Sequence, residues 1–230
     1  MGVSSPPSVK PRPIVGREAL ASLREAPVFP LPQAVLFPGA RMPLHVFEPR
    51  YRRLIRDALD TTRVLVVAHV SDPVHLDEHG NPSIEKVAGL GHIAEAQELP
   101  DGRFDLVIEG RARVFLRELA FLPPYRRAAI ELLDDTGGEV SAGDHASLLA
   151  VANAFIAFIQ AKDAAFQLTL PTSLPAGRIA DLCAHHLVLD AHARQQLLEL
   201  LDAGARVRRV ADVLAEQLAV FKREPQGALN

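Results

Sequence analysis

The spacing of apolar residues along this chain changes from that of strands to that of helices near residue 137. Apolar residues stand at every second position over 104–108, which is the period of a half-buried strand. After residue 137, Leu148, Ala152, Phe155 and Ile159 share one face of a 3.6-residue helix. Strands first and helices afterwards predict an α+β protein with two segregated parts.

Several short strands, separated by turn signals, are predicted before the change of period. The run 64–68 is apolar and rich in β-branched residues, as in a buried strand, and 128–133 is a further strand candidate. Pro100-Asp101-Gly102 stands between the segment 93–99 and the alternating run. Because proline presets φ and glycine accepts a positive φ, this tripeptide predicts a hairpin turn. Strands at this spacing are typical of an antiparallel, barrel-like sheet.

One helix is predicted within the strand-rich part. It opens at Glu48-Pro49, where the missing N–H of proline costs nothing. The residues that form its apolar stripe are Tyr51, Leu54, Ile55, Ala58 and Leu59. Its arginines face away from that stripe.

The part after residue 137 predicts four helices. The second has a stripe of Ile179, Leu182, Cys183 and His186, and the last has a stripe of Val207, Val210, Ala211, Leu214, Leu218 and Phe221. Asp190 and Asp202 stand where N-caps are expected. We therefore expect a strand-rich domain over 14–137, a helical domain over 138–223, and flexible tails at 1–13 and 224–230.

Composition excludes several classes of protein. Apolar residues make up 48% of the chain and charged residues 23%, as in a globular protein with a real core. Net charge is −3, which removes the overall basic signature of a nucleic-acid binder. Cys183 is the one cysteine and suits a reducing compartment. With no apolar run of ~18 residues and no signal peptide, we expect a cytoplasmic protein that does not cross a membrane.

Motifs for chemistry are weak or absent. The sequence has no Gly-Lys dipeptide for a phosphate loop. Gly89-Leu90-Gly91 resembles a dinucleotide fingerprint but opens a strand, so a bulge or a close approach of backbone explains it better. His75 and His79 stand in a segment predicted to be a loop, which cannot fix metal ligands. Cys183, His185 and His186 fit a core cysteine beside a packed His186, with His185 pointing elsewhere. We therefore predict no catalytic residue, no cofactor and no metal site.

The segment 26–51, which reads APVFPLPQAVLFPGARMPLHVFEPRY, resembles the opening of the N-terminal domain of the protease Lon (protease La). Later features agree in order along the chain. The DGR turn at 101–103 followed by Glu109, Gly110 and Arg113 resembles the family's hairpin, and 197–214 resembles its C-terminal helices. The resemblance covers about residues 26–220.

The resemblance implies a PUA-like antiparallel β pseudo-barrel followed by a helical bundle. In full-length Lon this region is regarded as recognising protein substrates, whereas the ATPase and protease modules lie C-terminal to it. The chain ends before either module would begin, so the resemblance implies a stand-alone, non-enzymatic module that binds peptides or proteins. Its expected partners are unfolded or extended protein segments, with a protease or a chaperone as further candidates.

A cleft between the sheet and the helices is the expected site of binding. Phe37, Met42 and Phe47 would supply its apolar contacts if they are exposed. The alternative is that all three belong to the core, and for Phe47, beside the helix start, the core position is favoured.

Two other functions stay open at this point. The arginines of the predicted helix, Arg50, Arg53 and Arg56, together with Arg111, Arg113 and Arg117, could make a basic face for RNA. Two tyrosines and no tryptophan leave little for base stacking, so nucleic acid is disfavoured. A hydrolase or metal site built from loops is the third possibility, and the weak or absent motifs disfavour it.

Overall fold

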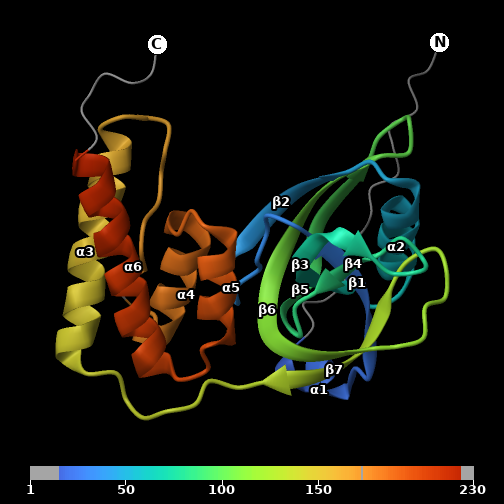
Figure 1. Ribbon diagram of the computed structural model, residues 1–230, viewed down its shortest axis with the longest axis horizontal. Coiled ribbons are helices and arrows are strands. Elements are labelled where there is room, and N and C mark those ends of the chain that lie inside the picture. The colour runs from blue at the N-terminus through green and yellow to red at the C-terminus, as the bar shows by residue number, and fades with distance from the viewer. Residues whose placement is uncertain (1–15, 172, 224–230) are drawn as a thin grey trace.

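The computed structural model describes residues 16–171 and 173–223. The tails predicted at 1–13 and 224–230 lie outside the described residues. Figure 1 shows the two parts side by side, with the strands on one side of the molecule and the helices that follow residue 137 on the other. The change of hydrophobic period near residue 137 falls in the connection between the last strand and the first helix of the bundle. The predicted α+β class and its strand-to-helix order are confirmed.

The strand-rich part is a sheet closed on itself. Its strands are β1 (Glu25–Leu31), β2 (Arg41–Val46), β3 (Val64–Leu76), β4 (Pro82–Ile84), β5 (Val87–Glu98), β6 (Phe104–Glu118) and β7 (Arg127–Leu133). They follow the order β1-β7-β6-β5-β3-β4, and β1 also pairs with β3, which closes the ring. The closing pair is parallel, with Val28 beside Val66, whereas the other pairs are antiparallel.

The hairpin predicted at Pro100-Asp101-Gly102 joins β5 and β6. Gly102 has a φ of 81°, a conformation that glycine adopts without strain. Because β6 is long, it pairs with β5 and also with both β2 and β7. The hairpin thus supplies the central strands of the pseudo-barrel.

Two helices cover the barrel. The predicted helix is α2 (Pro49–Asp60), whose buried side chains Tyr51, Leu54, Ile55 and Ala58 pack with Phe29, Leu65, Ile93 and Ile108 of the strands. A short helix, α1 (Arg17–Ser22), was not predicted, because Leu20 is the one buried residue among its described side chains and no apolar period marks it. Leu20 packs with a second set of strand residues that includes Val28 and Val66.

The helical part consists of α3 (Ala142–Gln160), α4 (Ala176–Leu187), α5 (Ala191–Glu199) and α6 (Ala203–Arg223). Polar caps set the starts of three of them. The Ser141 hydroxyl accepts from the Asp144 N–H at 3.0 Å, Asp190 Oδ1 from the Ala193 N–H at 2.7 Å, and Asp202 Oδ1 from the Ala205 N–H at 2.6 Å. The N-caps predicted at Asp190 and Asp202 are therefore confirmed.

Helix α3 is long and apolar enough to cross a membrane by length and composition, although one face of it is packed against α6 and α4. Its buried side chains are Leu148, Ala152, Phe155 and Ile156. Among residues 16–171 and 173–223, α3 is the one helix that meets this criterion. Length and composition alone therefore do not decide where α3 lies.

The connection between β1 and β2 links the two parts. Val35, Phe37 and Ala40 from this connection belong to the same buried cluster as the side chains of α3–α6. Glycines let this backbone press against the sheet. A Cβ added at Gly89 would lie 2.1 Å from the Leu36 carbonyl oxygen, and one at Gly110 would lie 2.0 Å from that of Phe37. The prediction that Gly89 serves a close approach of backbone is confirmed.

The segment 71–82 differs from its prediction as a loop. Strand β3 continues to Leu76, and β4 pairs with it through an irregular register. His75 therefore lies at the end of a strand, with its Nδ1 2.7 Å from Asp72 Oδ2. Pro73 and Pro82 argue against strands in this segment, because proline is tolerated only in edge strands and at bulges. The hairpin was therefore not predicted.

Candidate functional site

An apolar groove opens at the end of the barrel where β1 and β2 finish and α2 begins. It has a volume of about 460 Å³. The β3–β4 hairpin forms its other side. Phe29, Pro30, Leu31, Phe47, Tyr51 and Leu76 are among its lining residues. A concave surface with mainly apolar walls is typical of a ligand site.

Phe47 is the most prominent apolar residue of this groove. It is 62% exposed, and Leu76, which lines the same groove, is 56% exposed. Val46, one residue earlier, is buried, because successive side chains of β2 point to opposite faces. The favoured placement of Phe47 in the core is therefore wrong.

Phe37 and Met42 are not available to a ligand. Phe37 is fully buried between the barrel and the helices, and Met42 is buried inside the barrel with Ile108 beside it in register. The expectation that they line an exposed cleft is wrong for both. The physical reason is that β2 turns Met42 inward, while the glycines of β5 and β6 draw the backbone of Phe37 into the junction.

The polar groups around the groove are already paired. Arg50 Nε lies 3.1 Å from Glu48 Oε2, and the Arg50 guanidinium stands 4.7 Å from the centre of the Tyr51 ring. His45 Nδ1 lies 2.6 Å from Asp105 Oδ1. Burial raises the pKa of the Tyr51 hydroxyl, which keeps it neutral. A ligand therefore meets apolar surface with neutralised polar groups at its rim.

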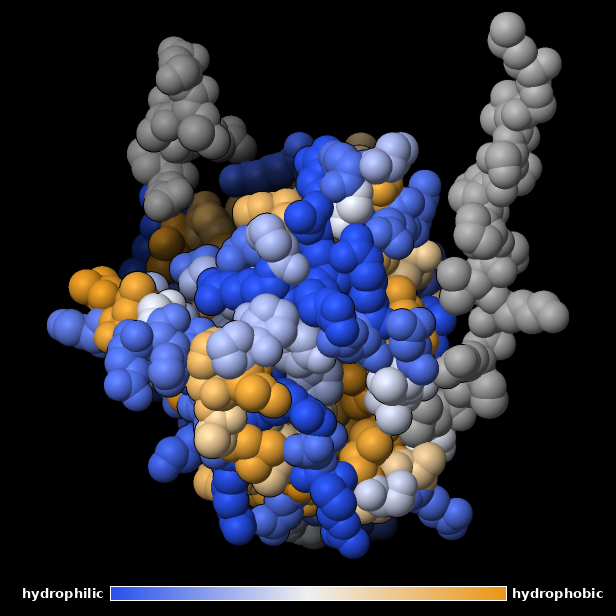
Figure 2. Space-filling model, turned by 90° about the vertical axis from the view of Figure 1, so that its right-hand side faces the viewer, coloured by the Kyte–Doolittle hydropathy of each residue, from blue (hydrophilic) through white to orange (hydrophobic). Residues whose placement is uncertain are grey.

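The arginines of the alternative basic face are each paired with an acid. Besides the Arg50–Glu48 pair, Arg53 Nε lies 2.8 Å from Asp57 Oδ1 and Arg56 Nη2 lies 2.6 Å from Glu98 Oε1. Figure 2 shows hydrophilic residues gathered over the upper part of this side of the molecule, at the height of α2 in Figure 1. Paired charges of both signs make a mixed surface, which attracts phosphates far less than free arginines do.

The strand arginines do not join this face. Arg113 is buried at the junction with the helices, where its Nη1 lies 3.2 Å from Asp181 Oδ2. Arg111 is bonded to Glu109 at 2.8 Å. The expectation of a basic face that includes Arg113 is wrong, because this residue points from β6 toward α4 and not into solvent.

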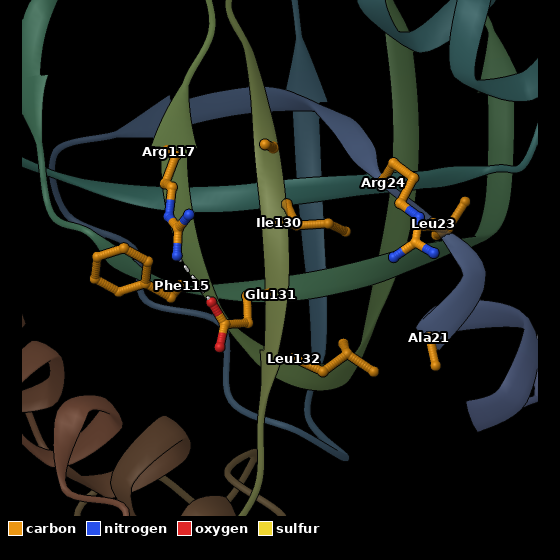
Figure 3. A pocket seen from close by; sticks show the side chains of 9 residues that line it. Ala21, Leu23, Arg24, Phe115, Arg117, Ile130, Glu131 and Leu132 are labelled. Atoms are coloured by element: carbon orange, nitrogen blue, oxygen red, sulfur yellow. Dashed lines mark hydrogen bonds and ion pairs between the residues drawn. The ribbon is translucent and has the colours of Figure 1, made fainter.

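A second hollow lies between α1 and the outer side of β6 and β7 (Figure 3). Its walls include Leu23, Phe115 and Ile130, and its volume is about 350 Å³. Arg117 and Glu131 point toward one another on its surface, 3.2 Å apart. This exposed ion pair leaves less apolar surface than the groove at Phe47. Of the predicted site residues, Arg117 of the alternative basic face lines this hollow, and it is paired with Glu131.

Cys183, His185 and His186 lie in the core of the helical part or at its edge. Cys183 is buried, and burial raises the pKa of its thiol to about 12. His185 is the half-buried histidine, with Nδ1 3.2 Å from the Val35 carbonyl oxygen, while His186 is exposed. The predicted roles of the two histidines are therefore reversed. In the described part of the chain, no group of three or more His, Cys, Asp or Glu side chains is arranged to hold a metal.

Together these features define an α+β module. Its pseudo-barrel carries an apolar groove and is packed against a helical bundle. The model of the family "ATP-dependent protease La (LON) substrate-binding domain" matches residues 25–216, and the chain belongs to this family. The resemblance of the 26–51 segment to Lon is thereby confirmed.

Curated relatives and solved structures agree with this assignment. The chain is 29% identical to Lon protease 2 of Herpetosiphon aurantiacus over 93% of its own length and 26% of the relative's, and 28% identical to Lon protease 2 of Bdellovibrio bacteriovorus over 86% and 25%. It therefore spans about a quarter of these relatives. The N-terminal domain of Mycobacterium avium complex Lon protease shares the fold, with a TM-score of 0.62, 18% identity, and coverage of 84% of this chain and 99% of that one.

Proposed function

We propose that this protein binds apolar segments of other proteins in the groove at Phe47, without catalysing a reaction. The observation that carries the proposal is that Phe47 and Leu76 line the same concave surface and are both more than half exposed. Large apolar side chains left open in a groove mark a binding site. The family description as a substrate-binding domain supports protein ligands.

The groove suits an extended segment better than a folded surface. Its walls come from two strand ends, a helix start and a hairpin, which leave a channel whose polar groups are already paired. Ordering a flexible ligand costs several kcal/mol. We therefore expect micromolar or weaker affinity, on the order of −8 kcal/mol or less favourable.

The proposal also includes a cytoplasmic location and the absence of enzymatic activity. A buried thiol in Cys183 suits the reducing cytoplasm. The matched family is a substrate-binding domain, and the chain spans about a quarter of its Lon relatives. We therefore expect the purified protein to hydrolyse neither ATP nor casein.

Salt dependence separates protein binding from RNA binding. A labelled, permanently unfolded polypeptide and a single-stranded RNA are each titrated with the protein at low and at high salt. Apolar contact is not screened, so the affinity for the polypeptide should change little, whereas phosphate contacts weaken steeply with salt. Tight RNA binding that collapses in salt and disappears when Arg50, Arg53 and Arg56 become alanine would contradict the proposal.

A further inference from the structure

The β3–β4 hairpin forms one wall of the groove at Phe47 and has little of its own to fix its position. Within residues 71–80, Asp72 is half-buried and the other residues are exposed. Strand β4 has three residues, and its pairing with β3 is interrupted by register shifts. A short, exposed two-stranded hairpin is at best marginally stable and opens easily. Contacts from outside the hairpin therefore matter for the shape of the groove.

The turn at the tip of the hairpin is closed by its own polar groups. Asp77 Oδ1 accepts from the N–H of His79 at 2.9 Å and from the N–H of Asn81 at 2.8 Å. The Asp77 N–H donates to the Asn81 carbonyl oxygen at 2.9 Å. These bonds shape the tip, but they do not join it to the barrel.

Arg126 joins the hairpin to the barrel. This residue precedes β7 and is 9% exposed. Its Nη1 donates to the carbonyl oxygen of Pro82, the first residue of β4, at 2.5 Å, and its Nε donates to Glu118 Oε2 of β6 at 2.7 Å. Its own carbonyl oxygen accepts from the Val28 N–H of β1 at 2.9 Å. Since bonds from a charged donor are strong, Arg126 ties β4 to both β6 and β1.

Phe121 makes a second contact with the hairpin. It belongs to the connection between β6 and β7 that ends at Arg126, and this connection passes beside the hairpin (Figure 1). The half-buried Phe121 ring stacks on the His79 imidazole, with ring centroids 4.9 Å apart. Phe121 thus holds the tip of the hairpin, while Arg126 holds the start of β4.

These contacts bear directly on the groove. Pro82, whose carbonyl oxygen Arg126 binds, is the partner of Leu76 in the hairpin register, and both residues line the groove. The Arg126 guanidinium also lies near Tyr51 at the start of α2. Burial raises the pKa of the Tyr51 hydroxyl, and the charge of Arg126 is among those that oppose the rise. Arg126 therefore connects the wall that carries Leu76 with the barrel end that carries Tyr51.

We propose that Arg126 and Phe121 are positioning residues of the groove, which hold the β3–β4 hairpin so that Leu76 contacts an apolar segment bound at Phe47. The inference rests on the proposed function. A wall that is already in place does not have to be ordered when the ligand arrives, and this favours binding. Release of the hairpin that leaves about a tenth of the molecules with the wall in place would raise the apparent dissociation constant about tenfold.

Arg126→Gln tests the role of Arg126 in binding. Fluorescence anisotropy with a labelled, reduced and alkylated polypeptide should give a dissociation constant at least about fivefold above that of the parent. The matched control is Arg111→Gln, at another mostly buried arginine of the barrel, which is bonded to Glu109 at 2.8 Å and does not line the groove. Urea unfolding measures the stability of both variants. The control should bind like the parent, even where it loses as much stability as R126Q.

Phe121→Ala tests the same inference without leaving a buried charge unpaired. It should weaken binding in the same direction as Arg126→Gln. Leu119→Ala, at an exposed apolar residue of the same connection, is its control and should bind like the parent. The F121A variant keeps the inference testable even where R126Q does not fold.

Hydrogen exchange separates positioning of the hairpin from a general effect on stability. In R126Q and F121A, the amides of residues 74–84 should exchange faster than in the parent, while those of β5 and β6 keep their rates. Polypeptide binding to the parent should slow exchange in the same segment. A uniform acceleration over the whole barrel would assign both residues a merely structural role and overturn the inference.

The outcomes distinguish this inference from the proposed function. A parent that binds, Phe47→Ser that does not, and both R126Q and F121A binding like the parent would leave the groove as the site and overturn the positioning roles. Equal losses of affinity in R126Q and R111Q would also overturn them. A parent that binds no polypeptide would contradict the proposed function itself, and the inference with it.

Discussion

Arg113 of β6 and Asp181 of α4 form an ion pair at the centre of the junction between barrel and helices. Both side chains are at most 2% exposed, and Arg113 Nη1 lies 3.2 Å from Asp181 Oδ2. Arg206 of α6, also fully buried, approaches the same carboxylate at 3.0 Å. Asp181 thus balances two buried guanidinium groups from different parts of the fold. The pair fixes how the two parts are joined.

Replacement of Asp181 by alanine should destabilise the protein strongly. It leaves Arg113 and Arg206 buried with less compensation, which typically costs about 3–5 kcal/mol. Urea unfolding followed by circular dichroism measures the change in the free energy of unfolding. The control is Glu131→Ala, which removes the exposed pair with Arg117 and should cost less than about 1 kcal/mol. Equal effects of the two substitutions would show that burial of the pair has no energetic consequence.

Substitutions of Phe37 and Phe47 should differ in their effect on the free energy of unfolding. Phe37→Ala empties a fully buried position in the junction and should cost about 3–5 kcal/mol of unfolding free energy. Phe47→Ala removes a side chain that is 62% exposed and should leave the unfolding free energy nearly unchanged. Denaturant titration of the two variants checks this order. A larger stability loss for Phe47→Ala would place Phe47 in the core after all.

Gly89 should tolerate no side chain. Because a Cβ there would lie 2.1 Å from the Leu36 carbonyl oxygen, Gly89→Ala must shift the β1–β2 connection away from the sheet. We expect a loss of at least about 2 kcal/mol, as for overpacked sites. Gly138→Ala is the control, since no heavy atom stands within 4 Å of its added Cβ. Similar melting temperatures for the two variants would contradict the close approach.

The fold should lose stability in mild acid. Burial, and then the neighbouring His186, lower the pKa of His185 to about 4, while the unfolded chain keeps a value near 6.5. Between these values the unfolded chain binds a proton that the folded chain does not. The contribution of neutral His185 to the free energy of unfolding is therefore fully present above about pH 6.5. It falls by roughly 2–3 kcal/mol as the pH falls toward 4.

Unfolding free energies measured from pH 7.5 to 4.5 test the effect of His185. The burial-lowered pKa values of His69 and His92 act in the same direction, so part of the slope belongs to them. His185→Asn should flatten the curve, and His186→Asn, at the exposed neighbour, should change it less. A parent protein that is equally stable at pH 7.5 and 4.5 would rule out buried neutral histidines.

Local patterns were enough to predict most of the fold. The period-2 run at 104–108, the turn at Gly102 and the stripe from Tyr51 to Ala58 each depend on neighbours in sequence, so their elements were found. The parallel pairing of Val28 with Val66 was missed, because it joins strands separated by a helix. The short helix α1 was missed because only Leu20 marks it.

The candidate site was only partly predictable. Phe37, Met42 and Phe47 are all apolar residues near one strand, and sequence alone did not show which of them points outward. The alternation along β2 would have separated Met42 from Phe47, had the strand's register been known. The burial of Phe37 depends on Gly89 and Gly110, which are more than 50 residues away along the chain. Long-range contacts of this kind determine which apolar side chains are exposed in the groove.

Fluorescence anisotropy with a labelled, reduced and alkylated polypeptide tests the central claim most directly. The parent protein is compared with Phe47→Ser and with Leu189→Ser, a similarly exposed apolar residue that is 58% exposed and lies outside the groove. We predict a micromolar dissociation constant for the parent, at least tenfold weaker binding for F47S, and unchanged binding for L189S. Equal affinities of the parent and F47S would contradict the assignment of the groove as the binding site.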